Sequence, residues 1–141
     1  MDDLDERLIA RLQEDARAPV SELARDLGLS RTTLQSRLAR LERSGVITGY
    51  SVKLSEQREA SVIHAFVMLT VEPKQAAAVT SALRRISNVR RLQSVSGPFD
   101  MIATVEAVSV SAMDTTIDEI GALPGVERTN SSIVLSTKFG R

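Results

Sequence analysis

Apolar residues in the first 44 positions recur at helical spacing in three short runs. Leucines at every fourth position predict a first helix that begins with the capping pair Asp3 and Glu6 and ends near Asp15. A second helix is predicted between a Ser21 cap and Gly28, whose freedom to adopt positive φ suits a helix end. Each helix has a single apolar face, so the three must pack together.

The third run predicts a helix that is capped by Ser30 and ends before Gly45. Leu34, Leu38 and Leu41 fall within about 60° of one another on a helical projection, which defines the buried side. A short helix, a glycine turn and a further helix form the pattern of a helix-turn-helix.

The second half of the chain alternates strand-like and helical segments in the order βαββαβ. The predicted strands are 62–71, 89–95, 101–105 and 132–137, and the predicted helices are 74–86 and a segment ending at Pro124-Gly125. This order is that of a ferredoxin-like fold, a four-stranded antiparallel sheet with both helices on one face. The fold class is therefore predicted as α+β.

Residues 46–54 turn toward β-branched and aromatic types and are read as an extended connector or a strand, followed by a polar loop at 55–59. We therefore expect a helix-turn-helix domain at 1–50, a linker at 51–60 and a ferredoxin-like domain at 61–141. Residues 62–71 are apolar almost throughout, which favours a partner on the sheet's second face and hence a homodimer.

The amino-acid composition excludes several kinds of site and several classes of protein. The 141 residues include no cysteine, which excludes disulfides and thiolate metal sites. No apolar run approaches the ~20 residues of a membrane span, and the acidic first residues do not resemble a signal peptide. We expect a cytoplasmic protein without cofactor or metal, in which the single histidine, His64, is structural.

Charge is neutral overall but unevenly distributed. Residues 30–44 carry four arginines and one acid, whereas residues 1–26 carry eight acids and four arginines. The net charge of zero is therefore compatible with a basic helix next to an acidic segment. For nucleic-acid binding the local distribution of charge matters more than the net charge.

The exposed side of the third helix combines arginines with short hydroxyl side chains. Arginines bind phosphates or guanine, and short polar residues let a helix end approach base edges. The candidate contacts to double-stranded DNA are Ser30, Arg31, Thr32, Thr33, Ser36, Arg37 and Arg40. The alternative is an ordinary solvated helix.

The segment Ser96-Gly97-Pro98-Phe99-Asp100 predicts a turn between two strands. Exposed backbone N–H groups beside a carboxylate could hold a small amino acid, or the segment is a plain hairpin turn with Phe99 as a hydrophobic plug. No nucleophile and base pair, P-loop or dinucleotide motif is present, so an enzyme is the least favoured class. A ligand-binding protein that does not bind DNA is the other alternative.

The chain resembles the Lrp/AsnC (feast/famine) family of transcription regulators. The matching residues are Leu4-Asp5, Leu27-Gly28-Leu29-Ser30, Thr33, Arg37, Leu38, Leu41-Glu42, Gly45-Val46-Ile47, Val95 to Asp100 and Leu123-Pro124-Gly125-Val126. The resemblance implies DNA binding controlled by a small effector, typically an amino acid. It also implies a homodimer that can assemble into a tetramer or octamer.

The resemblance further implies an effector site in a cleft between subunits. By position, its residues would be Ser94, Ser96, Gly97, Pro98, Phe99 and Asp100, closed by Ser132, Ile133 and Val134 from a neighbouring subunit. Pro98 stands where family members often have a polar residue, and it removes one backbone N–H.

Overall fold

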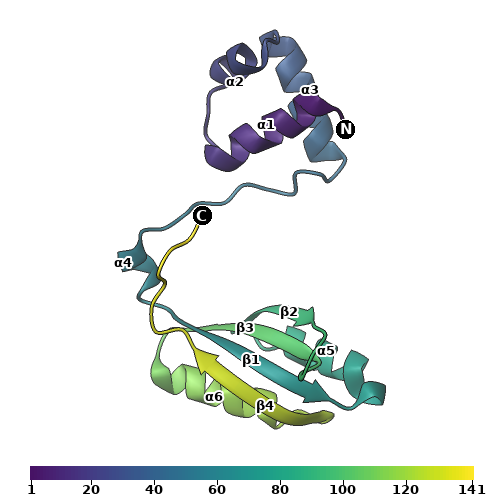
Figure 1. Cartoon of the computed structure of the whole chain (residues 1–141), viewed down its shortest axis with the longest axis vertical. Coiled ribbons are helices and arrows are strands. Elements are labelled where there is room, and N and C mark those ends of the chain that lie inside the picture. Colours follow the sequence, from purple (N-terminus) through teal and green to yellow (C-terminus); the bar gives the residue numbers. More distant parts are fainter. The chain divides into compact units, whose positions relative to one another are not determined.

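The computed structural model describes residues 1–141 as two compact units, Met1–Lys53 and Leu54–Arg141. The first unit contains α1 (Asp3–Glu14), α2 (Val20–Leu27) and α3 (Arg31–Arg43) (Figure 1). The three predicted helices are confirmed. The division between units falls inside the predicted linker, whose bounds remain a prediction.

Two helix starts differ from the sequence prediction. The N-cap of α1 is Asp2, whose side chain pairs with the backbone of Asp5 in a reciprocal capping box, so the predicted Asp3 and Glu6 pair is wrong. The cap of α2 is Pro19 rather than Ser21, because the Pro19 carbonyl already accepts hydrogen bonds from two N–H groups of the first turn.

The predicted helix-turn-helix junction is confirmed. Gly28 ends α2 at φ +68°, in the left-handed region that glycine adopts without steric cost. Ser30 then caps α3, with its side chain accepting the Thr33 N–H at 3.1 Å. These two residues determine the tight path between the helices.

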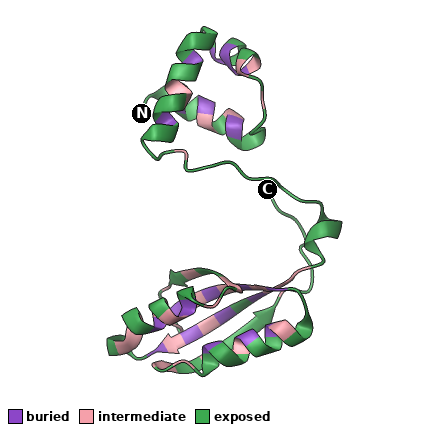
Figure 2. Ribbon diagram, turned by 180° about the vertical axis from the view of Figure 1, so that it is seen from behind, coloured by how far each residue is buried: buried purple, intermediate pink, exposed green.

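The core of the first unit is built almost entirely from leucine. Its buried residues are Leu8, Leu12, Leu23, Ala24, Leu27, Leu34 and Leu41 (Figure 2). Leu38 is only partly buried, at the edge of the predicted stripe. Every helix contributes to this core, which fixes the side of α3 that remains exposed.

The segment between the two folded regions differs in part from expectation. Residues 46–54 form no strand, so of the two alternatives the extended connector is the one observed. The predicted loop at 55–59 instead contains a helical turn, α4 (Glu56–Glu59), because Ser55 caps it through the Arg58 N–H.

The second unit has the predicted βαββαβ order. Its elements are β1 (Ile63–Val71), η1 (Pro73–Gln75), α5 (Ala76–Arg84), β2 (Val89–Ser94), β3 (Met101–Ala107), α6 (Val110–Gly121) and β4 (Val126–Ile133). The sheet is antiparallel with strand order β2-β3-β1-β4. The α+β, ferredoxin-like prediction is confirmed.

The last strand lies earlier in the chain than the sequence predicts. It covers Val126–Ile133 instead of 132–137, because β4 is an edge strand whose residues are mainly polar and exposed. Its pairing with β1 defines it, from Val126 beside Val71 to Ile133 beside Ala65. Hydrophobic alternation, the signal used for the other strands, is weak along such an edge.

Both long helices cover the same face of the sheet (Figures 1 and 2). Alternate residues of β1 and β3 bury their side chains there, against Val79 and Leu83 of α5 and Met113 and Ile120 of α6. The opposite face carries Phe66, 44% exposed. None of the helices is both long and apolar enough to cross a membrane.

Candidate DNA-binding surface and effector site

The exposed side of α3 begins at its capped end. Arg31, Thr32, Thr33 and Ser36 are exposed there, away from buried Leu34. The Ser30 hydroxyl donates a hydrogen bond to Thr33 Oγ1 at 2.8 Å, so part of this polar surface is held in place by the cap itself. A short-side-chain surface at a helix N-terminus can approach a nucleic-acid groove closely.

Two of the α3 arginines are paired with acids from the start of the chain. Arg37 Nη1 lies 2.7 Å from Asp2 Oδ2 and 3.1 Å from Asp5 Oδ1, and Arg40 Nη2 lies 2.8 Å from Asp5 Oδ2. We call Asp2, Asp5, Arg37 and Arg40 the α1–α3 ion network. It joins residues 32 to 35 positions apart in sequence.

The members of the network differ in their access to solvent. The side chain of Asp5 is 1% exposed, that of Arg37 20% and that of Arg40 58%. Arg37 is therefore held mainly inside the unit, while most of Arg40 stays accessible. Arg31 and Arg43 form no salt bridge at all.

The network changes the acid–base properties of its members. The hydrogen bond from Arg37, helped by the Asp5 N–H, lowers the pKa of Asp2 to about 2. Burial by itself raises the pKa of Asp5, but the hydrogen bonds from the Asp2 N–H and Arg37, with the charge of Arg40, lower it overall. The bonds to Asp2 and Asp5 raise the pKa of Arg37.

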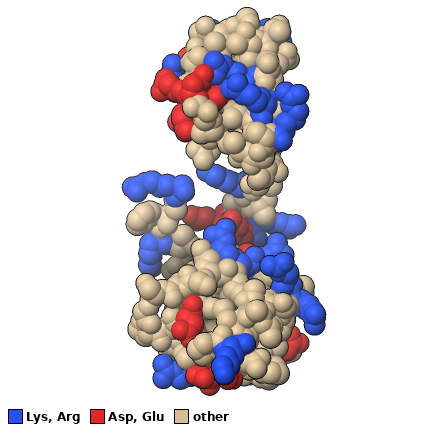
Figure 3. All heavy atoms as spheres, turned by 90° about the vertical axis from the view of Figure 1, so that its right-hand side faces the viewer, with Lys and Arg blue, Asp and Glu red and all other residues tan.

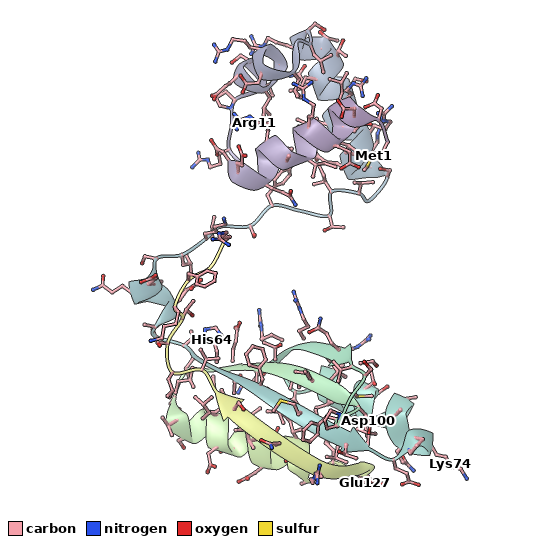
Figure 4. All side chains as sticks on the ribbon, viewed as in Figure 1. Met1, Arg11, His64, Lys74, Asp100 and Glu127 are labelled. Carbon is pink, nitrogen blue, oxygen red and sulfur yellow. The ribbon has the colours of Figure 1, made fainter.

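The α3 helix could be predicted from the sequence, but Asp2 and Asp5 could not be identified as partners of its arginines. The only available signal was the excess of acids in residues 1–26. A second acidic group, Asp26 with Glu14, holds Arg11 between α1 and α2, with Arg11 Nη2 2.9 Å from Asp26 Oδ2. Basic and acidic side chains lie close together on the surface of the first unit (Figure 3), and Figure 4 shows Arg11 on α1.

The predicted effector loop connects β2 to β3 and is tied to the end of β1. The Asp100 N–H donates to the Leu69 carbonyl, and Asp100 Oδ2 accepts the Val71 N–H at 2.8 Å. Gly97, at φ +128°, and Pro98 are exposed. One carboxylate oxygen of Asp100, Oδ2, thus has a structural partner, whereas Oδ1 accepts no hydrogen bond within the chain.

Phe99 has a defined partner. The guanidinium carbon of Arg128, from β4, lies 5.4 Å from the centre of the Phe99 ring, a cation–π distance. Phe99 is partly buried. This contact connects the effector loop to the edge strand.

Within one chain the two halves of the predicted effector site are not brought together. Val134 donates its N–H to His64 at the start of β1, whereas Asp100 binds Val71 at the end of β1. Seven residues of strand place these points roughly 20 Å apart, and Figure 4 shows His64 and Asp100 at opposite ends of β1. Ser94 and Ser96 belong to the Asp100 end, and Ser132 lies beside Phe66 nearer the other.

Two cavities of the chain lie elsewhere. One of about 360 Å³ runs along α1 and residues 46–53, and one of about 250 Å³ lies between α5 and β2. Neither is lined by residues 94–100.

Comparison with known proteins identifies both units. Residues 1–42 match the AsnC-type helix-turn-helix domain, and residues 64–141 match the Lrp/AsnC ligand binding domain. The transcriptional regulator LrpA of Mycobacterium tuberculosis is 36% identical over 140 residues, which are 99% of this chain and 93% of LrpA. The regulator FL11 of Pyrococcus abyssi is 30% identical over 97% of this chain and 91% of FL11.

Comparison with solved structures supports the same assignment. A feast or famine regulatory protein from M. tuberculosis, complexed with L-methionine, superimposes with a TM-score of 0.86 at 35% identity, covering 99% of this chain and 95% of that one. AsnC of E. coli shares the fold, with a TM-score of 0.87 at 23% identity over 100% of this chain and 96% of that one. The chain therefore belongs to the Lrp/AsnC family of transcriptional regulators, with a DNA-binding helix-turn-helix and a ligand-binding domain.

Proposed function

We propose that this regulator binds specific DNA sequences through α3 as a symmetric homodimer, and that a small effector, an amino acid, alters its DNA affinity or assembly. We take residues 1–50 as the DNA-binding domain, 51–60 as the linker and 61–141 as the effector-binding and oligomerisation domain. A protein with this role works in the cytoplasm, where the chromosome lies. The observation that supports the proposal most strongly is the exposed, capped end of α3, whose hydroxyls and arginines face away from the leucine core.

The α3 residues divide into three groups by their surroundings. Arg31, Thr32 and Ser36 are exposed and are our candidates for base edges and phosphates. Arg40 is largely exposed and is held by Asp5, which orients it for a phosphate. Ser30 and Thr33 form the cap, and Arg37 contacts DNA only with the guanidinium surface that the acids leave open.

The substitution Arg40→Ala tests the DNA-binding surface. If Arg40 contacts a phosphate, operator affinity falls and the slope of log K against log salt decreases by roughly one. The measurement is a gel-shift titration at several salt concentrations, on an operator selected from genomic fragments. Arg17→Ala, at an exposed position without a salt bridge, is the control. Unchanged affinity and slope would remove Arg40 from the surface.

The proposed dimer uses the sheet face that the helices leave open. Phe66, Met68 and Ile102 lie on adjacent strands of that face and remain partly or largely exposed in one chain. A second copy would bury them, and tetramers or octamers would be built from such dimers. Phe66→Asp should yield a monomer in light scattering, whereas Val110→Asp, at an exposed position of α6 on the helix side, should not. Identical masses for both variants would contradict this interface.

The proposed effector site combines the 94–100 loop of one subunit with Ser132 and Val134 of another, since one chain separates them. The relative bound to L-methionine supports an amino acid as the ligand. Calorimetric titration of the twenty amino acids, starting with L-methionine, tests it with and without operator. Any effect must be reciprocal, so DNA changes effector affinity by the same factor. Absence of binding in both series would remove the effector from the proposal while leaving DNA binding intact.

A further inference from the structure

An arginine of the last strand lies beside the effector loop but is not among the predicted effector residues. Arg128 of β4 is exposed and forms no salt bridge. Its guanidinium carbon lies 5.4 Å from the centre of the Phe99 ring. A guanidinium that lies over a ring uses its flat face, so the N–H groups along its edge stay available to an anion. Arg128 is therefore oriented by Phe99 and has no counter-charge within the chain.

The strand between Arg128 and the effector loop carries an unpaired hydroxyl group. Thr70 lies near the end of β1, opposite Arg128 in the pairing of β1 with β4. Its Oγ1 is shielded from solvent and is the one buried side-chain polar atom of the chain without a hydrogen-bond partner. A buried hydroxyl without a partner costs free energy, because it has lost its hydrogen bonds to water. This atom therefore requires an explanation.

Asp100 flanks Thr70 on the other edge of β1. Its N–H donates to the Leu69 carbonyl and its Oδ2 accepts the Val71 N–H, one residue to either side of Thr70. The second carboxylate oxygen, Oδ1, accepts no hydrogen bond within the chain, and Asp100 forms no salt bridge. Neighbouring strands lie about 4.8 Å apart, so the backbones of Asp100 and Arg128 are roughly 10 Å apart across β1.

The side chains of Thr70 and Arg128 lie on the sheet face that the helices leave open. The neighbours of Thr70 in β1 are buried in the core, so Thr70 points the other way. Thr129, which follows Arg128, lies against Gly121 of α6, so Arg128 also points away from the helices. The contact between Arg128 and Phe99 therefore spans β1 at Thr70, which accounts for the shielding of its hydroxyl.

Two structural explanations account for only part of this arrangement. A cation on an edge strand discourages pairing with other chains, which would explain an arginine on β4. A cation–π contact with Phe99 stabilises the position of the loop. Neither gives Thr70 Oγ1 a hydrogen-bond partner, and neither uses Oδ1 of Asp100.

We infer that Arg128, Thr70 and Asp100 of one chain bind the charged groups of a free α-amino acid. Arg128 tilts from the Phe99 ring and forms paired hydrogen bonds with the α-carboxylate, which brings this carboxylate within reach of the Thr70 hydroxyl. Asp100 Oδ1 accepts a hydrogen bond from the α-ammonium. Hydrogen bonds of about 3 Å on either side of the amino acid bridge the distance between the two charged residues. The inference rests on the proposed function, which supplies the amino-acid effector, and adds Arg128 and Thr70 to its site.

The experiment measures binding of L-methionine and of L-methioninamide, which lacks the carboxylate, to the full-length protein by calorimetry. If the parent does not bind L-methionine, the amino acid among the twenty that it does bind is used with its own amide. Arg128→Gln removes the guanidinium. Arg91→Gln is the matched control, at an exposed position on the other edge strand and without a salt bridge. Circular dichroism checks that each variant folds.

The role of Arg128 predicts two results. Arg128→Gln should bind L-methionine about tenfold more weakly or worse, and Arg91→Gln should bind it like the parent. The parent should prefer L-methionine over L-methioninamide by a similar factor, and Arg128→Gln should lose this preference, because the carboxylate has lost its partner. Equal affinities of the two variants for L-methionine, or an unchanged preference in Arg128→Gln, would overturn the inference.

Thr70→Val tests the hydroxyl, because valine keeps the shape of the side chain. Without ligand, the Tm of this variant should equal or exceed that of the parent, since the hydroxyl has no hydrogen bond to lose. Its affinity for L-methionine should nevertheless fall about threefold to tenfold. A lower Tm with unchanged affinity would show that Thr70 supports the fold alone and would overturn its place in the site.

The outcomes separate this inference from the proposed function. An amino acid that binds the parent and the variants at residues 70 and 128 equally well would overturn the inference and leave the proposed effector in place. Absence of binding of all twenty amino acids to the parent would overturn both.

Discussion

Arginines of α3 differ in their surroundings from the four arginines that flank the connection between α5 and β2. We call these four, Arg84, Arg85, Arg90 and Arg91, the α5–β2 arginines. In α3, carboxylates from the same chain hold Arg37 and Arg40 at 2.7 to 3.1 Å. Among the α5–β2 arginines only Arg90 has an acidic neighbour, with its Nε 3.6 Å from Glu106 Oε2. A guanidinium that its own chain neutralises has a fixed position and contributes to the fold. One without a counter-charge remains available to an anion from outside.

The difference has a structural cause. Asp2 and Asp5 already serve as the capping box of α1, so their carboxylates stabilise the helix start and the α1–α3 contact at once. A nearly unexposed carboxylate such as Asp5 requires partners, because an unpaired charge inside a protein is costly. The connection from α5 to β2 contains no acid that could pair with the α5–β2 arginines.

The largest expected effect follows from removing the centre of the α1–α3 ion network. Asp5→Asn removes the charge that faces both Arg37 and Arg40, so we expect Tm of the first unit to fall on the order of 5 °C. Operator affinity should fall as well, because Arg40 loses its orienting partner. Hydrogen exchange, measured separately over residues 1–53 and 54–141, reports the stability of each unit.

Asp3→Asn provides the matched control, since Asp3 lies in the same first turn, is exposed and forms no salt bridge. If both variants lowered the protection of residues 1–53 equally, the effect would come from the charge of the helix start. The distinction between held and free arginines would then lose its basis.

The sequence was sufficient for features that depend on local spacing. Leucine periodicity predicted α1, α2 and α3, and alternating segment types predicted the βαββαβ order, because both signals lie within a few residues. It was insufficient where one part of the chain acts on another. The pairing of Asp5 with Arg40 joins positions 35 residues apart, and β4 is defined by its pairing with β1 more than by its own polar residues.

The candidate sites show the same limit. Exposure of Arg31, Thr32 and Ser36 could be predicted, because the leucine stripe determines the opposite side of one helix. The separation of Asp100 from Val134 could not, since it depends on which end of β1 each residue meets.

An intermediate effect is expected from acid. The folded-state pKa of Asp2 is about 2, below its ordinary value of 3.8, and that of Asp5 is lowered too. A lowered pKa stabilises the folded state at a pH above the ordinary value, and this contribution is lost as the pH falls from about 4 to 2. Protection of residues 1–53 should therefore fall in this window.

Asp2→Asn sharpens the acid experiment. This variant should be less stable than the parent at neutral pH, and its stability should decline less between pH 5 and 2, because one of the titrating groups is gone. Parallel pH profiles for the variant and the parent would show that the Asp2–Arg37 contact, at 2.7 Å in the folded chain, does not persist in solution.

The smallest expected effect is that of salt, which should act on the two arginine groups in opposite directions. Raising NaCl from about 0.05 to 0.5 M shortens the screening length from roughly 14 to 4 Å. Screening weakens the attraction within the α1–α3 ion network and relieves the repulsion among the α5–β2 arginines. The first unit should therefore lose about 1 °C in Tm and the second gain about as much. General effects of NaCl on apolar burial apply to both units, so the difference between their Tm shifts is the informative quantity.

The variant R84A/R90A/R91A should abolish the Tm gain of the second unit and leave the Tm shift of the first unit unchanged. A common shift of both units, unaffected by that variant, would mean that neither arginine group differs from an ordinary surface charge.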